Sequence, residues 1–307
     1  MSLYSLRFIS RRATCVPQVA CFFYPSTWAR YLLSSISIPK EGIHTTMEKF
    51  GQTEAVYHHD ETKHELETTV LASIPFAQWD DATKKIFKGA SDGGCLVVTS
   101  STIFYAKGGG QPSDTGTMTS FDQTSTFTVT SVQKLPSGTI MHLGTYSGNP
   151  FEEQMLVTQK INKDARKLHS QIHDAGHILA SAVRRLGIPD LREVKAQHYP
   201  DVAFVEFQGL IGGDKKEDIE QIANEIVDDD RLIAVRWWSP EELKVKSWTA
   251  PEGTGGKDDV VRAVEIEGVG AYMCGGTHVR STGLVGKFKV RKIKRQQGVT
   301  RVSYEMV

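Results

Sequence analysis

The sequence predicts an α+β protein, in which a small N-terminal β-barrel precedes a two-layer domain of helices packed against a mostly antiparallel sheet. Two patterns predict this fold. In the first half, short runs of apolar and β-branched residues are separated by clusters of Gly, Pro, Ser and Asp, which is typical of a small barrel. In the second half, two longer segments with helical amphipathic periodicity alternate with further strand-like segments.

We place the barrel domain at residues 60–155 and its boundary with the second domain near Phe151–Lys160. The segment Phe76–Lys88 contains neither Gly nor Pro and is expected to form one helix. The expected barrel strands are Glu65–Ser73, Cys95–Phe104, Phe127–Leu135, Thr139–Leu143 and Gln154–Ile161.

The second domain, residues 156–307, is expected to begin with a long helix that Asp164 caps and that ends at Gly187 and Pro189. The apolar stripe of this helix is Leu168, Ile172, Leu179, Val183 and Leu186. A second amphipathic helix is expected over Asp214–Asp229. Its inward side is Ile219, Ile222, Ala223, Ile226 and Val227.

The remaining segments of this domain are expected to be strands and one loop. Val194–Tyr199 and Val202–Phe207 flank Pro200-Asp201 and predict a hairpin. A glycine-rich loop is expected over Glu252–Lys257. The other expected strands are Leu232–Trp238, Val260–Glu267, Leu284–Ile293 and Val299–Met306.

Residues 1–46 form a leader of different composition. The first 40 residues contain seven serines, four arginines and one lysine but no acid, which is typical of a mitochondrial transit peptide. Two alternatives are an extension upstream of an internal start at Met47 and an ordered segment. The protein is therefore expected in the cytoplasm, in mitochondria or in both.

The whole-chain composition limits the possible functions. The 36 basic and 36 acidic residues give a net charge of zero, which argues against nonspecific coating of nucleic acid but allows a local basic patch. No uncharged apolar stretch is long enough to span a membrane. The four cysteines, Cys15, Cys21, Cys95 and Cys274, form no disulfide framework, and this favours a reducing compartment.

Two segments of the second domain contain residues that ligate metals. His169, His173 and His177 recur at the i, i+4 spacing, which places them on one face of the first helix. Cys274 and His278 flank Gly275-Gly276-Thr277, and the glycines allow a tight turn that brings both side chains to one point. The helix histidines alone, or Cys274 and His278 alone, could be structural. Together, one thiolate and several imidazoles favour zinc. Asp174 follows His173, so the pattern is not the His-Glu-x-x-His of zinc proteases.

Three consecutive glycines, Gly108, Gly109 and Gly110, follow a predicted strand and precede Gln111 and Asp114. Such a loop lets backbone N–H groups approach a phosphate, a ribose or a carbonyl. No Gly-Lys-Ser/Thr ending follows, so the loop is not a phosphate-binding loop of the ATPase type. The alternative is an ordinary hairpin connection.

The C-terminal strands are rich in basic residues and contain no acid between Lys287 and Arg301. On a strand, Lys287, Lys289 and Arg291 share one face. We interpret them as contacts to RNA phosphates. The alternative is a solvated edge strand whose lysines prevent pairing with another sheet.

The Gly108–Asp114 segment, His173-x3-His177 and Cys274-Gly-Gly-Thr-His278, in this order, resemble the editing module of alanyl-tRNA synthetase. Residues 60–307 resemble more closely the freestanding alanyl-tRNA editing proteins of the AlaX type. The Cys-Gly-Gly-Thr-His element is also similar to the second additional domain shared by threonyl- and alanyl-tRNA synthetases.

This resemblance implies hydrolysis of the ester bond in tRNA(Ala) wrongly charged with Ser or Gly. It implies one zinc ion per chain, held by His173, His177, Cys274 and His278. The candidate catalytic or substrate-contacting residues are Gln111 at the mouth of the amino-acid pocket, Thr102 near a seryl hydroxyl, and His169. The candidate substrate and RNA contacts are Gly108, Gly109, Gly110, Asp114, Lys287, Lys289 and Arg291.

The chain departs from the family pattern at Asp174, where a hydroxyl residue is expected, and at Lys107, where an acid is common. Neither change removes an expected ligand. The chain lacks the length and the ATP-phosphate loop of a synthetase core, so neither ATP binding nor ligase activity is expected. Zinc could activate water, or it could hold the substrate if all four ligands close its shell.

Two alternative functions follow from the same residues. The first is a catalytically inactive, zinc-stabilised tRNA-binding module. The second is a metal-dependent hydrolase of a small ester or amide, which would act without RNA. The sequence does not indicate an oligomeric state.

Overall fold

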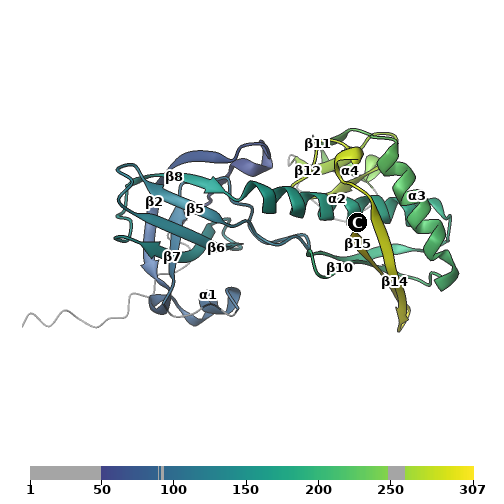
Figure 1. The fold of residues 1–307 in the computed structure, drawn as a ribbon, viewed down its shortest axis with the longest axis horizontal. Coiled ribbons are helices and arrows are strands. Elements are labelled where there is room, and N and C mark those ends of the chain that lie inside the picture. The colour runs from purple at the N-terminus through teal and green to yellow at the C-terminus, as the bar shows by residue number, and fades with distance from the viewer. Residues whose placement is uncertain (1–49, 89, 91–92, 248–259) are drawn as a thin grey trace, which may run out of the picture. The chain divides into compact units, whose positions relative to one another are not determined.

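The computed structural model describes residues 50–88, 90, 93–247 and 260–307 (Figure 1). These residues all belong to one compact unit. The expected leader, Met47 and the loop Glu252–Lys257 lie outside the described residues. No helix in the described part of the chain is both long and apolar enough to cross a membrane.

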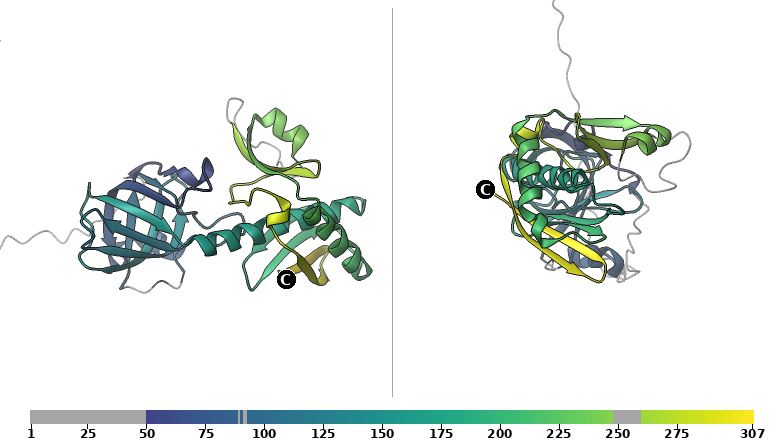
Figure 2. Two further views of the ribbon diagram at one scale, coloured as in Figure 1. Left: turned by 45° about the horizontal axis from the view of Figure 1, so that its top comes forward. Right: turned by 90° about the vertical axis from the view of Figure 1, so that its right-hand side faces the viewer.

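Six antiparallel strands close a β-barrel in the order β2-β3-β7-β6-β5-β8 (Figure 2), which confirms the predicted barrel. Alternating burial along these strands places Val97, Met118 and Phe127 in the barrel interior. Their bounds are β2 Glu65–Pro75, β3 Cys95–Thr99, β5 Gly116–Ser120, β6 Thr126–Lys134, β7 Ile140–Ser147 and β8 Leu156–Ile161.

Two details of the barrel differ from the sequence prediction. Strand β5 was not expected, because its small and polar residues resemble those of a loop. It becomes a barrel strand by pairing with β6 on one side and with β8 on the other. The predicted helix Phe76–Lys88 is instead a short 3-10 turn, η3 Phe76–Gln78, followed by α1 Asp81–Ile86. Asp80 starts α1 because its carboxylate accepts a hydrogen bond from the Thr83 N–H at 2.7 Å.

Before the barrel, β1 Glu54–Ala55 pairs in parallel with β4 Ser101–Thr102, and the 3-10 turn η2 spans Val56–His58. Thr102 of β4 is fully buried. Its hydroxyl lies 2.9 Å from His142 Nε2 and 3.2 Å from Gln159 Oε1. A polar network therefore lies among the apolar side chains of the barrel interior.

The second half of the chain contains the long helix α2, Lys163–Arg185, and α3, Lys216–Asp228, as expected. Asn162, not Asp164, caps α2, because its side chain accepts the Ala165 N–H at 3.1 Å. Leu168 does not join the apolar stripe and is 39% exposed. The buried face of α2 is otherwise continuous with Ile172, Leu179 and Val183.

Helices α2 and α3 pack against an antiparallel four-stranded sheet in the order β14-β15-β10-β9 (Figures 1 and 2). The predicted hairpin of β9 and β10 is confirmed. Strand β14 begins at Phe288, later than expected, because Thr282–Leu284 form the 3-10 turn η5. The bounds are β9 Arg192–His198, β10 Ala203–Gln208, β14 Phe288–Gln296 and β15 Val299–Met306, with the turn η4 Gly213–Lys215 before α3.

A separate three-stranded sheet has the order β11-β12-β13 and lies beside α4. Its strands are β11 Ile233–Trp238, β12 Val261–Ile266 and β13 Gly270–Met273. Helix α4, Pro240–Lys246, was not expected. It starts with a capping box in which Ser239 and Glu242 each accept the other's backbone N–H. Together these elements confirm a mixed α and β fold with a closed barrel and several sheets.

Candidate metal centre and adjoining pocket

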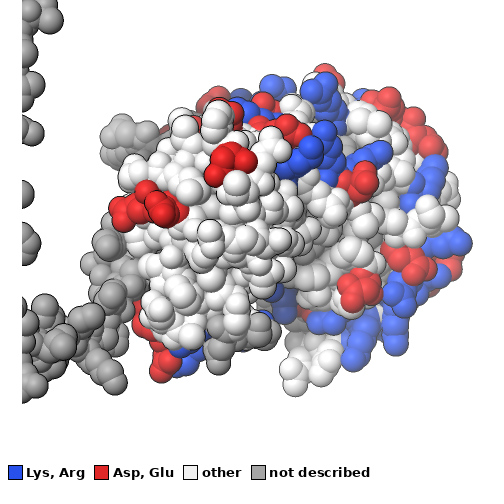
Figure 3. Space-filling model, turned by 60° about the vertical axis from the view of Figure 1, so that its left-hand side comes forward, with Lys and Arg blue, Asp and Glu red and all other residues white. Residues whose placement is uncertain are grey.

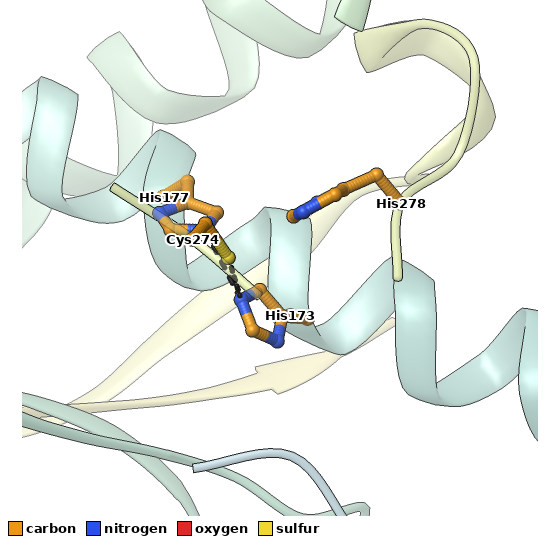
Figure 4. Close-up of side chains that lie close together, drawn as sticks. All are labelled: His173, His177, Cys274 and His278. Carbon is orange, nitrogen blue, oxygen red and sulfur yellow. Dashed lines mark hydrogen bonds between the residues drawn. The ribbon is translucent and has the colours of Figure 1, made fainter. Parts of the chain in front are cut away.

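Four side chains that can ligate a metal meet in the second half of the chain. His173 and His177 lie one turn apart on α2, while Cys274 and His278 follow β13 in the sequence (Figure 4). All four are buried, and one potential ligand atom from each lies within 4.8 Å of the others. The distance from His173 Nε2 is 3.1 Å to His177 Nε2 and 3.2 Å to Cys274 Sγ. The structure thus brings together the expected group.

The charge state of His173 and His177 suits ligation. Burial lowers the pKa of His173 and His177 well below its ordinary value, and the neighbouring histidines lower it further. Both rings are therefore neutral at neutral pH and carry a free lone pair for a metal. One thiolate and three imidazoles form a donor set that suits a four-coordinate ion.

Asp174 has a definite role that the sequence did not reveal. It is fully buried, and its carboxylate accepts the His278 Nδ1–H at 2.6 Å and the Val279 N–H at 2.8 Å. His278 Nε2, buried and without a hydrogen-bond partner among the described residues, is the atom that could bind a metal. Asp174 therefore orients the His278 ring, as carboxylates commonly do behind metal-binding histidines.

The substitution Asp174→Asn tests this role. We expect metal affinity to fall about 10- to 100-fold, because a neutral amide holds the His278 ring less firmly and polarises it less. Competition with a chromogenic chelator measures the affinity. The matched control is Asp164→Asn, an exposed first-turn residue of the same helix, which should leave the affinity unchanged. Equal affinities in the two variants would contradict the role of Asp174.

The Cys274–His278 turn depends on its glycines and on Thr277. A Cβ on Gly276 would lie 2.4 Å from His173 Cε1, so only glycine fits there. Thr277 is fully buried, and its hydroxyl lies 2.8 Å from that of Ser170 on α2. These contacts fix the turn against the helix that carries the two other ligands.

The glycine-rich loop reaches this same turn. Gln111 Nε2 donates to the Thr277 hydroxyl at 2.8 Å, and Gln111 Oε1 accepts the Thr277 N–H at 3.1 Å. Gly109 and Gly110 have φ values of +52° and +78°, and a Cβ on Gly110 would lie 2.5 Å from the Ala196 carbonyl oxygen. The three predicted motifs are therefore in contact, although they are far apart in the sequence.

A pocket of about 710 Å³ adjoins the cluster. Its walls include Gly109 and Gly110, the three residues His173, His177 and Cys274, and several residues that the sequence analysis did not single out. The latter include His58, Glu193, His198, Trp237 and Arg262. Arg262 lies next to the ligands, because it donates to the Cys274 carbonyl at 2.7 Å and forms a buried ion pair with Glu61.

The sequence contained only weak signals for these additional residues. His198 lies in the predicted strand Val194–Tyr199 and Glu193 directly precedes it, and a polar residue of a strand more often faces solvent. Burial lowers the pKa of His198 to about 3 and raises that of Glu193 to about 7. Both groups therefore owe their properties to burial, which depends on the packing of β9 against α2.

The structure does not bring every predicted site residue to the cluster. Thr102 is buried in the barrel network described above, so its contact with a seryl hydroxyl stays a prediction. His169 is half-buried one turn before His173 and is not part of the four-residue group, and its role also stays a prediction. Asp114 is 1% exposed and forms an ion pair with Arg166 of α2. A role of Asp114 in contacting the substrate or RNA therefore stays a prediction.

Ion pairs and a β-bulge change the predicted row of RNA-contacting residues Lys287, Lys289 and Arg291. Lys287 lies 2.5 Å from Asp228 and Arg291 lies 3.4 Å from Glu305, so these two are already paired. The register of β14 shifts between Val290 and Lys292, so Arg291 is an extra residue and not part of a regular alternation. On β14 as described, the exposed basic residues without an ion pair are Lys289, Lys292, Lys294 and Arg295.

Basic side chains cover only part of the face that Figure 3 shows. In the view of Figure 3, most of the surface is uncharged, and Lys and Arg lie among Asp and Glu toward one side. This agrees with the zero net charge of the sequence. Any contact with a polyanion is therefore local.

Two families match parts of the chain. Residues 261–303 match the threonyl and alanyl tRNA synthetase second additional domain. Residues 36–165 match the class II (A) tRNA synthetases. The first match contains Cys274 and His278, and the second contains the glycine-rich loop.

Individual relatives agree with these matches. The chain is 31% identical over 257 residues to an alanine–tRNA ligase of Pyrococcus abyssi, covering 82% of this chain and 26% of the relative. It is 34% identical over 204 residues to an alanine–tRNA ligase of Thermotoga maritima, covering 66% of this chain and 23% of the relative. The chain thus spans about a quarter of the length of these relatives.

Proposed function

Because the chain is an editing-type relative of the alanyl-tRNA synthetases, we propose that it deacylates mischarged tRNA(Ala) in trans. The substrate would be Ser-tRNA(Ala), with Gly-tRNA(Ala) as a second substrate. The observation that carries the proposal is the junction of the three motifs, with the four-ligand cluster and the glycine-rich loop beside one pocket. The similarity covers a quarter of each relative, and ATP-dependent ligation is not part of the proposal.

Zinc is the metal that we propose for the cluster. One thiolate and three imidazoles fit a tetrahedral zinc ion, and the unpaired, buried Nε2 of His278 is explained by such an ion. Bound zinc would supply Lewis acidity toward the ester or toward water. His173, His177, Cys274 and His278 would hold it, and Asp174 would orient His278.

The chain's own residues would position the ester. Gln111 is hydrogen-bonded at both ends of its amide to Thr277, so it holds the glycine-rich loop against the ligand turn before any substrate arrives. The glycines leave room for backbone N–H groups to approach a ribose or an ester carbonyl. Exposed Lys289, Lys292, Lys294 and Arg295 would contact RNA phosphates.

The test compares the loss of the ester from Ser-tRNA(Ala), Gly-tRNA(Ala) and Ala-tRNA(Ala) with the full chain in its zinc-loaded form. We expect the seryl ester to be hydrolysed at least about 100-fold faster than the alanyl ester, since a site that pairs a hydroxyl discriminates strongly against substrates that lack one. Chelation of the metal should abolish the reaction, and zinc should restore it. Equal loss of the seryl and alanyl esters would contradict the proposal.

One observation favours a second candidate. Four protein ligands complete a tetrahedral shell, and closed shells are typical of structural zinc sites. An inactive tRNA-binding module would bind tRNA(Ala) without hydrolysing any ester. A hydrolase of small esters, in contrast, would act on seryl methyl ester as well as on seryl-tRNA. The same assay separates these alternatives.

A further inference from the structure

His198 lies beside the candidate metal centre and belongs to none of the motifs above. It is 3% exposed, it lines the 710 Å³ pocket, and its ring centroid lies 4.5 Å from that of His173. On β9 it pairs with Ala203, so it shares a face of the sheet with residues that pack against α2. The ring is therefore held between the sheet and the helix.

The hydrogen bonds of Tyr304 determine the tautomer of His198. The Tyr304 hydroxyl donates its single proton to the Ile172 carbonyl at 2.8 Å. The same oxygen lies 2.7 Å from His198 Nδ1 and must accept there. Nδ1 of the neutral ring therefore carries the proton, and Nε2 carries a lone pair.

Gly176 shows which edge of the ring faces α2. A Cβ at this position would lie 2.2 Å from His198 Cε1 and 2.6 Å from His198 Nδ1. A glycine inside a helix is unfavourable, and here it leaves the space that the imidazole occupies. Nε2 has no hydrogen-bond partner among the residues that the structure describes, and it is not among the fully buried unpaired atoms. The pocket is thus the side from which a donor can reach it.

A neutral acceptor suits a hydroxyl donor better than an ammonium donor in this pocket. Lys195 lines the same pocket, and its positive charge disfavours a second cation, while Arg262, which also lines it, is already paired with Glu61. The proposed substrate offers one neutral donor that alanine and glycine lack, namely the serine hydroxyl. On the basis of the proposed function, we infer that Nε2 of His198 accepts a hydrogen bond from the seryl hydroxyl and makes the site selective for serine.

The test is a double-mutant cycle on binding. The ligands are stable 3′-amide-linked adenosine derivatives that carry a seryl or a 2-aminobutyryl group, in which a methyl replaces the hydroxyl. The protein variants are the full wild-type chain and His198→Asn, whose amide can still donate to Tyr304. We expect wild type to prefer the seryl ligand about 10- to 100-fold and the variant to lose this preference. A variant that keeps the preference would overturn the inference.

The controls separate this inference from folding and from the proposed function. Metal content and melting temperature should match wild type. If His198→Asn is unstable, Tyr304→Phe is the alternative variant, because it leaves the His198 ring in place but no longer fixes its tautomer. The preference for the seryl ligand should then fall severalfold. An unchanged preference in this variant would likewise contradict the role of His198. A wild-type protein that prefers the seryl ligand but leaves Ser-tRNA(Ala) intact refutes the proposed function alone. Hydrolysis without coupling at residue 198 refutes this inference alone.

Discussion

Replacing Cys274 with serine is expected to remove the bound metal and to lower seryl-tRNA(Ala) hydrolysis by more than about 100-fold, since the thiolate is the softest of four converging ligands. Serine is nearly isosteric, so the buried turn keeps its packing and its contact with Gln111. Metal content per chain, measured by atomic emission, and the hydrolysis rate are the two readouts.

Cys95→Ser is the matched control for this substitution. Cys95 is half-buried on β3 of the barrel and lies outside the ligand group. This variant should keep one metal ion per chain and full activity. A Cys274→Ser protein that retains both would refute the metal centre. One that loses metal and keeps activity would refute only the part of zinc in hydrolysis.

Replacing Asp114 with alanine is expected to lower the free energy of unfolding by about 3–5 kcal/mol, because it leaves the Arg166 guanidinium buried without its counter-charge. Both side chains are almost fully buried, at 4% and 1% exposure. The carboxylate also accepts the Tyr105 N–H at 2.7 Å, and this bond would be lost as well. Urea denaturation followed by circular dichroism measures the change.

The control for this second prediction is Lys160→Ala, which breaks the barrel ion pair with Glu65. Those side chains are 61% and 55% exposed, so we expect almost no change in the free energy of unfolding. If Asp114→Ala proves as mild as Lys160→Ala, the buried pair is not what couples the glycine-rich segment to α2. The tRNA affinity of the folded Asp114 variant should be unchanged, because the carboxylate is not exposed.

Much of the fold could be predicted because local patterns reflect burial. The strands β2, β6 and β8 and the helices α2 and α3 were predicted within a few residues, since their apolar periodicity is strong. The prediction failed where the pattern is weak or interrupted. Strand β5 is short and polar, α4 is short, and Asp80 starts a new helix inside a segment that looked continuous.

In the candidate site, too, locally encoded residues were predicted and roles that depend on packing were not. The i, i+4 spacing of His169, His173 and His177 and the compact turn from Cys274 to His278 are local properties, so they predicted a metal site. The resemblance to the alanyl-tRNA editing proteins reduced the expected ligands to His173, His177, Cys274 and His278, which the structure brings together. The roles of Asp174 and Asp114 were not predicted, because an acid is equally compatible with a bound substrate, a solvated surface and a buried partner.

The sequence by itself thus determined the barrel, the main helices and the identity of the potential ligands, since each depends on residues close together in the chain. Only the tertiary structure decided that Asp174 supports His278, that Asp114 neutralises Arg166, and that Gln111 is bound to Thr277. It also decided that His198 presents a lone pair to the pocket. The physical reason is that charge, tautomer and accessibility depend on partners that packing brings from distant parts of the chain.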